Sequence, residues 1–198
     1  MLASRTLGPQ PRGLLLFDID GTLMQVHGVG AASLLAAIHD AYELDIDPGD
    51  YVMAGRTDAG ILIDLLATAG VDDATARAGF ARAWPAYRQH LRAGLLEQPP
   101  ELCPGIFELC HSLAWQGDWL MGLLTGNEEQ VAWHKLGSVG IDGFFRLGAF
   151  GGQAASRNEL PALAIAQAEA KLGAPLAREH VVIIGDTPRD IACARYAG

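Results

Sequence analysis

The sequence is poor in cysteine and in positive charge. Its three cysteines, Cys103, Cys110 and Cys193, form neither a CxxC pair nor a cluster with histidine at metal-ligand spacing. We therefore expect free thiols in a reducing compartment and no disulfide framework. Lysine and arginine total 14 against 23 aspartates and glutamates, which gives a formal net charge of -9. Because nucleic acids and anionic membranes are polyanions, neither is expected as the main partner.

The chain also lacks a long apolar run. Residues 1–12 carry two arginines and two prolines, so they are predicted to form a loose tail and not a signal peptide or a membrane anchor. Hydrophobic residues make up 50% of the 198 residues, which is enough to bury a core without disulfides. These features predict a cytoplasmic globular protein with no membrane partner.

Four short apolar runs are typical of buried parallel strands, because they do not alternate strictly and helical patterns separate them. They cover residues 14–17, 119–124, 147–150 and 181–184. Helices are predicted between these runs, with Asn127 and Asn158 as the N-caps of two of them. The alternation predicts an α/β fold with a doubly wound, Rossmann-like parallel sheet and right-handed crossovers.

The interval between the first and second runs has helical periodicity and no convincing strand. Helices are expected over residues 31–42, 58–69 and 74–95. An aromatic and aliphatic stripe on the last of these indicates packing and not a ligand site; it consists of Phe80, Trp84, Tyr87 and Leu91. We therefore predict an α/β core domain, residues 1–26 and 99–198, with an all-helical domain, residues 27–98, inserted into it.

Acidic or small polar residues follow three of the four predicted strands. They are Asp18 and Asp20 after the first run, Thr125, Gly126 and Asn127 after the second, and Asp186 and Asp190 after the fourth. In open parallel sheets, ligands bind beyond the carboxyl ends of the strands, so these residues are expected to converge. Carboxylates gathered in this way repel one another unless a hard cation binds, and oxygen ligands favour Mg²⁺. The hydroxyl of Thr125 and the backbone amide of Gly126 are suited to holding a phosphate.

These motifs resemble those of the haloacid dehalogenase-like hydrolase superfamily, and in particular its phosphatases and phosphomutases with a helical cap. The resemblance covers nearly the whole chain. It rests on Asp18-Ile19-Asp20-Gly21-Thr22 as the first motif, Thr125 as the second, and Gly185-Asp186-Thr187-Pro188-Arg189-Asp190 as the fourth. It implies that residues 27–98 form a cap over the site.

The resemblance also implies chemical roles. Asp18 would attack phosphorus and form an aspartyl phosphate, and Asp20 would act as general acid and then as general base. Mg²⁺ would be held by Asp18, the backbone carbonyl of Asp20, and Asp186. Asp190 would act as a direct or an outer ligand.

The third motif departs from the pattern of the superfamily, which usually places a lysine there. Arg157 is the cation in this stretch, and its guanidinium can bridge a carboxylate and a phosphate oxygen. Lys135 is the less favoured candidate, because it is expected to extend over the surface. In the cap, Gly55-Arg56-Thr57-Asp58 resembles a loop that faces the active site, so Arg56 is expected either to bind a substrate anion or to be a surface arginine beside a Thr57 helix cap.

The function implied is a Mg²⁺-dependent phosphomonoester hydrolase that acts on a small phosphorylated metabolite. Two alternatives stay open: a β-phosphoglucomutase-like enzyme, which uses the same core residues, and a phosphate-binding protein without turnover. A haloacid dehalogenase is disfavoured because it lacks the second aspartate, here Asp20. A phosphonoacetaldehyde hydrolase is disfavoured because its cap lysine has no counterpart: Lys135 and Lys171 both lie outside the cap. The resemblance further implies one more strand after residue 198, so a longer form of the chain is expected.

Overall fold

The computed structural model describes residues 11–152 and 154–198, and its centre is a parallel sheet of four strands in the order β5-β4-β1-β6. The strands are β1 (Gly13–Phe17), β4 (Trp119–Thr125), β5 (Gly148–Phe150) and β6 (Val181–Ile184). Each lies within one residue of a predicted run, which confirms the α/β prediction. Of the predicted tail, residues 1–12, all but the last two lie outside the described residues.

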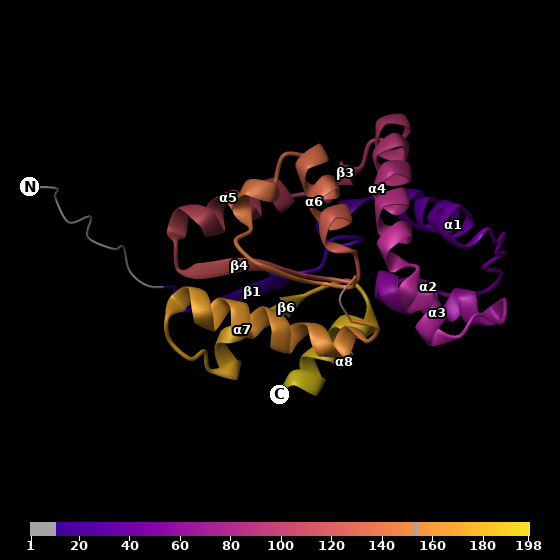
Figure 1. The fold of residues 1–198 in the computed structure, drawn as a ribbon. Helices are drawn as coiled ribbons and strands as arrows, with labels where there is room; N and C mark the ends of the chain where they lie inside the picture. Colours follow the sequence, from indigo (N-terminus) through magenta and orange to yellow (C-terminus); the bar gives the residue numbers. More distant parts are fainter. Residues whose placement is uncertain (1–10, 153) are drawn as a thin grey trace, which may run out of the picture.

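Helices cover both faces of the sheet (Figure 1). One face carries α5 (Ile106–Gln116) and α6 (Glu129–Ser138), and the other carries α7 (Leu160–Leu172) and α8 (Pro188–Ala197). Leu15 and Phe17 pack into the hydrophobic cluster on the α5 and α6 side, whereas Leu14 and Leu16 pack into the cluster on the α7 side. This alternation follows from the two-residue period of a strand and explains why β1 is buried along its whole length.

Residues 27–98 contain four helices and no strand. The helices are α1 (Val29–Tyr42), α2 (Asp58–Thr68), α3 (Asp73–Ala78) and α4 (Phe80–Glu97). They share a hydrophobic cluster, which includes the predicted stripe on α4 and also Val131 of α6. Figure 1 shows this group at one end of the sheet. The inserted helical cap that the resemblance implied is therefore part of the fold.

Two short strands that the sequence analysis did not predict connect the helical group to the sheet. They are β2 (Met24–Gln25) and β3 (Glu101–Leu102), which pair antiparallel. A strand of two residues is too short to show a periodic pattern. The remaining elements are single 3₁₀ turns at Asp142–Phe144, Arg157–Glu159 and Arg178–His180.

The predicted helix over residues 74–95 is wrong as a single element, because it breaks at Gly79 into α3 and α4. A Cβ atom at Gly79 would lie 2.4 Å from the ring of Tyr42, so only glycine fits. The Tyr42 hydroxyl donates a hydrogen bond to the carbonyl oxygen of Ala76, 2.5 Å away. The break therefore accommodates a tyrosine from α1.

The two predicted asparagine caps are also wrong. Helix α6 is capped by Glu128, whose carboxylate accepts a hydrogen bond of 3.1 Å from the backbone amide of Val131. The turn before α7 is capped by Ser156, whose hydroxyl accepts a hydrogen bond of 3.3 Å from the amide of Asn158. Among the described residues, no helix combines the length and the apolar character needed to cross a membrane.

Candidate active site

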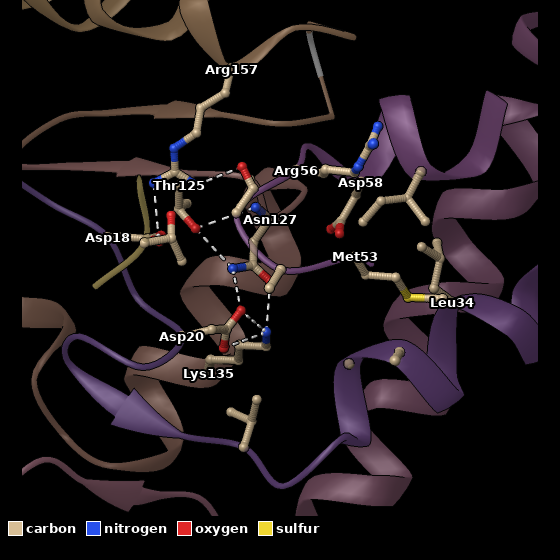
Figure 2. Close-up of a pocket in the computed structure, with 18 of the residues that line it drawn as sticks. Asp18, Asp20, Leu34, Met53, Arg56, Asp58, Thr125, Asn127, Lys135 and Arg157 are labelled. Carbon is tan, nitrogen blue, oxygen red and sulfur yellow. Dashed lines mark hydrogen bonds and ion pairs between the residues drawn. The ribbon is translucent and has the colours of Figure 1, made fainter. Parts of the chain in front are cut away.

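A cavity of about 300 Å³ lies between the end of the sheet and the helical group (Figure 2). Both parts of the chain line it. Of the site residues predicted from the sequence, those that line the cavity are Asp18, Asp20, Arg56, Thr125, Gly126, Asn127, Arg157 and Asp186. Asp190 is the exception, since it lies behind Arg157. The structure thus brings the predicted residues to one place.

Asp18 is fixed by the backbone of the sheet. Its amide donates a hydrogen bond of 2.9 Å to the carbonyl oxygen of Ile184, which extends the β1–β6 ladder by one residue. Its carboxylate accepts a hydrogen bond of 2.8 Å from the amide of Ile19. Gly21 then turns the chain at a φ of 83°, and a Cβ atom there would lie 2.3 Å from a carboxylate oxygen of Asp186. Glycine at this turn allows the first and fourth motifs to approach each other.

Arg157 lies between two buried carboxylates. Its Nη2 atom is 3.0 Å from Oδ2 of Asp18 and forms a second, shorter ion pair with Asp190. Burial is the largest influence on Asp18 and raises the pKa of its carboxyl to about 6, although the positive charge of Arg157 opposes this shift. Arg157 therefore stands beside Asp18, where the third-motif cation was expected.

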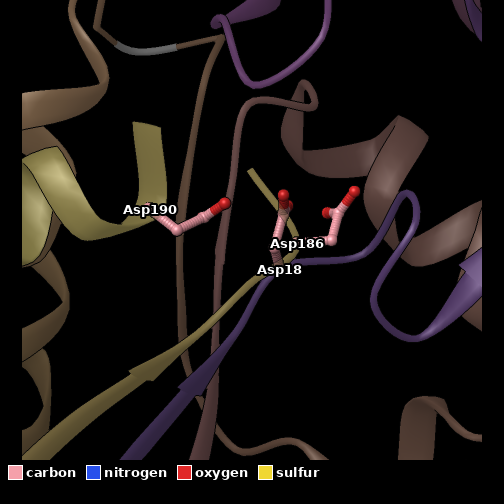
Figure 3. Close-up of side chains that lie close together, drawn as sticks. All are labelled: Asp18, Asp186 and Asp190. Atoms are coloured by element: carbon pink, nitrogen blue, oxygen red, sulfur yellow. The ribbon is translucent and has the colours of Figure 1, made fainter. Parts of the chain in front are cut away.

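Asp18, Asp186 and Asp190 present carboxylate oxygens within 4.8 Å of one another (Figure 3). Such a set of oxygen donors fits a hard divalent cation. Asp190 is the least available of the three, because one of its oxygens contacts Arg157 and the other accepts hydrogen bonds from the amide and hydroxyl of Thr187, at 3.0 and 2.7 Å. The bond from the Thr187 amide is one half of the capping box of α8.

Lys135 is buried, so its predicted position on the surface is wrong. Its Nζ atom lies 2.9 and 2.7 Å from the two carboxylate oxygens of Asp20 and 2.6 Å from Oδ1 of Asn127. Its side chain is only 1% exposed. Side chains on a helix point back toward its N-terminus, so a lysine two turns into α6 reaches the end of the sheet from which α6 starts.

Asn127 connects the second motif to the first. Its side-chain amide donates hydrogen bonds of 2.8 Å to both the hydroxyl of Thr125 and Oδ2 of Asp20. At Gly126, a Cβ atom would lie only 1.9 Å from the carbonyl oxygen of Arg56. Glycine is therefore required here for the helical group to lie against the sheet.

A family profile matches nearly the whole chain. Residues 13–198 match the family profile described as haloacid dehalogenase-like hydrolase. The chain belongs to this hydrolase family. The resemblance to this superfamily, stated in the sequence analysis from its motifs, is thereby confirmed at the level of the family.

Solved structures share the fold of this hydrolase at low sequence identity. CbbY from Rhodobacter sphaeroides, in complex with phosphate, has a TM-score of 0.69 at 18% identity, covering 94% of this chain and 83% of that chain. A predicted phosphatase from Clostridium acetobutylicum has a TM-score of 0.64 at 19% identity, over 94% and 82%. A predicted phosphoglycolate phosphatase from Haemophilus somnus has a TM-score of 0.62 at 20% identity, over 96% and 84%. Among curated proteins, no significant relative was found.

On the helical side of the hydrolase, the structure adds Asp58, a residue that the sequence analysis did not assign to the site. Asp58 is buried in the first turn of α2, and its Oδ2 atom accepts a hydrogen bond of 2.7 Å from the backbone amide of Glu128. Burial is the main cause that raises the pKa of its carboxyl to about 7, against the positive charge of Lys135. Asp58 ends the stretch Gly55-Arg56-Thr57-Asp58, which resembles a loop that faces the active site, but an acid at a helix start is common, so it was not assigned a role.

Arg56 lies at the edge of the cavity. Its Nη1 atom is 2.9 Å from Oδ2 of Asp64, and its guanidinium lies 4.8 Å above the ring of Tyr51. Thr57 caps α2 by accepting a hydrogen bond of 3.1 Å from the amide of Gly60, and its own hydroxyl donates to the carbonyl oxygen of Ala155. The Thr57 cap is confirmed, whereas substrate binding by Arg56 stays a prediction.

Proposed function

We propose that this hydrolase is a Mg²⁺-dependent phosphomonoesterase that acts on a small phosphorylated metabolite through an aspartyl phosphate. The observation that carries the proposal is the position of Asp18. It lies at the end of β1, inside a cavity, in contact with a buried arginine and within reach of two further carboxylates. A buried carboxylate with this support is suited to attack an electrophilic phosphorus.

Each residue would have one task. Asp18 attacks phosphorus, and Arg157 neutralises charge on the phosphoryl oxygens while holding Asp18 in place. The hydroxyl of Thr125 and the amide of Gly126 bind the phosphoryl group, beside Asn127. Asp20 protonates the leaving oxygen and then takes a proton from the water that hydrolyses the intermediate, so that one carboxyl serves both half-reactions.

Asp18 and Asp186 would hold Mg²⁺, together with the backbone carbonyl of Asp20. The bound cation would neutralise charge between the nucleophile and the phosphoryl oxygens. Asp190 would contribute mainly through Arg157, because Arg157 and Thr187 already use both of its oxygens. The proximity of the carboxylate oxygens of Asp18, Asp186 and Asp190 supports this proposal, since a cation offsets the repulsion between them.

The helical group, residues 27–98, would act as a lid. The amide of Asp58 donates a hydrogen bond of 2.7 Å to the carbonyl oxygen of Gly126, and the amide of Ala59 donates one of 3.0 Å to that of Gly151. A bidentate ion pair, at 2.6 and 3.1 Å, joins Arg88 to Glu128. With a cavity of about 300 Å³ behind these contacts, the closed lid admits only a small substrate.

The test is a phosphate-release assay over a panel of small phosphate esters, with Mg²⁺ and with Mg²⁺ removed by EDTA. Asp18→Asn should lower turnover by at least about 10³-fold, because the amide cannot form the covalent intermediate. Asp142→Asn, at an exposed position, removes the same charge and should have no effect.

The proposal fails if the wild type releases no phosphate from any ester, if EDTA changes nothing, or if Asp18→Asn retains full activity. Transfer of the phosphoryl group to a second hydroxyl of the substrate, without release of phosphate, would instead favour a mutase. Product analysis of the same reactions separates these two outcomes.

A further inference from the structure

The wall of the cavity that belongs to the helical group has its own chemistry. Leu34, Met53 and Ile61 give it an apolar surface, and Asp58 and Tyr87 interrupt that surface with polar atoms. Figure 2 shows the Asp58 carboxyl opposite Asp18 and Thr125, near Met53 and Leu34. If the phosphoryl group lies against Asp18, then the organic part of the ester faces this wall.

The positive groups around this wall are paired with carboxylates of the protein. The ammonium of Lys135 has three contacts, two with Asp20 and one with Asn127, which match its three N–H donors. It therefore has no donor left for a ligand.

The N-terminus of α2, a usual place for an anion, is occupied as well. Its first amides donate to carbonyl oxygens of Gly126 and Gly151, and the amide of Gly60 donates to Thr57. The guanidinium of Arg56 pairs with Asp64 and lies over the ring of Tyr51, and its buried Nε atom has no hydrogen-bond partner among the described residues. In Figure 2 it lies beyond Asp58, on the side away from Lys135.

We propose that Asp58 and Tyr87 make this site selective for phosphate esters whose organic part is uncharged and carries hydroxyl groups, and that Asp58 excludes esters that also carry a carboxylate. This inference rests on the proposed phosphatase function and specifies its substrate class. Asp58 acts as a specificity residue, not as part of the reaction.

The physical reason is the cost of a second negative charge. A substrate carboxylate would be taken out of water against a buried acid, and the nearby cations, Lys135 and Arg56, are already paired with carboxylates of the protein. A hydroxyl meets no such cost, because it can donate to the ionised carboxyl of Asp58 or accept from the protonated one. A substrate carboxylate could bind only against the protonated form of Asp58, whose pKa burial raises to about 7. The Tyr87 hydroxyl, whose pKa burial raises well above its ordinary value, stays protonated beside Asp58.

Glycerol 3-phosphate and 3-phosphoglycerate form a matched pair for the test. They have the same carbon chain, but glycerol 3-phosphate ends in a hydroxymethyl group and 3-phosphoglycerate ends in a carboxylate. The wild type should show a kcat/KM at least about tenfold higher for glycerol 3-phosphate, because repulsion between Asp58 and the carboxylate of 3-phosphoglycerate lowers kcat/KM for that ester. Equal values, or a preference for 3-phosphoglycerate, would overturn the inference and point to Arg56 as an anion-binding residue. This comparison needs no variant.

Asp58→Asn assigns the preference to its residue. It should reduce the ratio of the two kcat/KM values toward one, chiefly by raising activity on 3-phosphoglycerate. Asp50→Asn, which removes an equal charge from an exposed residue of the helical group, should leave the ratio unchanged. Tyr87→Phe should weaken activity on glycerol 3-phosphate without improving that on 3-phosphoglycerate. A ratio that Asp58→Asn does not change contradicts the role of Asp58.

The assay distinguishes this failure from failure of the proposed function. Suppose that some ester of the panel releases phosphate, but the wild type does not prefer glycerol 3-phosphate and Asp58→Asn does not change the ratio. Only the proposed substrate class is then wrong. If no ester releases phosphate, the phosphatase proposal itself fails.

Discussion

The two walls of the cavity support their buried acids in different ways. On the sheet side, Asp18 contacts the guanidinium of Arg157 at 3.0 Å, whereas on the helical side Asp58 accepts a hydrogen bond from a backbone amide and makes no ion pair within the described residues. The pKa of each carboxyl is raised, to about 6 and about 7. The sheet side is thus organised around paired charges, and the helical side around hydrogen bonds and apolar surface. One wall suits a phosphoryl group, and the other suits a neutral organic group.

The largest effect that tests this contrast is expected at Arg157. Arg157→Met should lower kcat by roughly 10²- to 10³-fold, because one charge stabiliser of the phosphoryl group is lost. It should also lower the free energy of unfolding by about 3–5 kcal/mol, since two buried carboxylates lose their partner. Phosphate release and denaturant unfolding measure the two effects.

Arg157→Lys is the control for charge. It restores the cation that the superfamily usually has, so stability and turnover should both lie well above those of Arg157→Met. If Arg157→Met keeps wild-type kcat, the paired charges of the sheet wall serve only the fold, and the contrast between the walls loses its functional meaning.

A smaller effect is expected at Lys135. Lys135→Met should lower kcat by roughly 10- to 100-fold with KM little changed, because Asp20 loses the contacts that orient its carboxyl toward the leaving group. Lys135→Arg keeps the charge and should recover part of the loss. Steady-state kinetics on both variants decide this, and an increase in KM alone would assign Lys135 to substrate binding.

The smallest expected effect concerns the pH dependence of stability at Asp58. Its folded pKa of about 7 lies above the ordinary 3.8, so the folded state binds this proton more tightly than the unfolded state. The resulting stability is present below about pH 4 and is lost as the pH rises toward 7. Asp58→Asn has no carboxyl to titrate and does not lose stability in this way. The Tm of the variant minus that of the wild type should therefore increase between pH 5 and 8. Thermal unfolding without metal measures the difference, and a difference independent of pH would contradict the prediction.

The sheet and the polar residues at the ends of its strands could be predicted from the sequence, because the patterns that indicate them are local. An apolar run followed directly by Asp18, or by Thr125 and Gly126, places these residues at a strand end without knowledge of the rest of the fold. Arg157 was assigned differently, through the resemblance to the superfamily, as the cation in the stretch where the third motif usually has a lysine.

Lys135 and Asp58 could not be assigned, because their environment depends on how helices pack. The burial of Lys135 requires that one face of α6 lie under Asp20, and that of Asp58 requires that α2 lie against the sheet. Neither of these packing arrangements produces a periodic pattern in the sequence. The break at Gly79 is similar, since it depends on Tyr42 from a different helix.

The hydrogen bonds between the start of α2 and the loops after β4 and β5 have a kinetic consequence. They attach the helical group to the ends of two neighbouring strands, through the carbonyl oxygens of Gly126 and Gly151. If the helical group opens as the lid proposed above, these bonds and the ion pair of Arg88 with Glu128 have to break together. The frequency of that opening would then set an upper limit on turnover, however fast the chemical step.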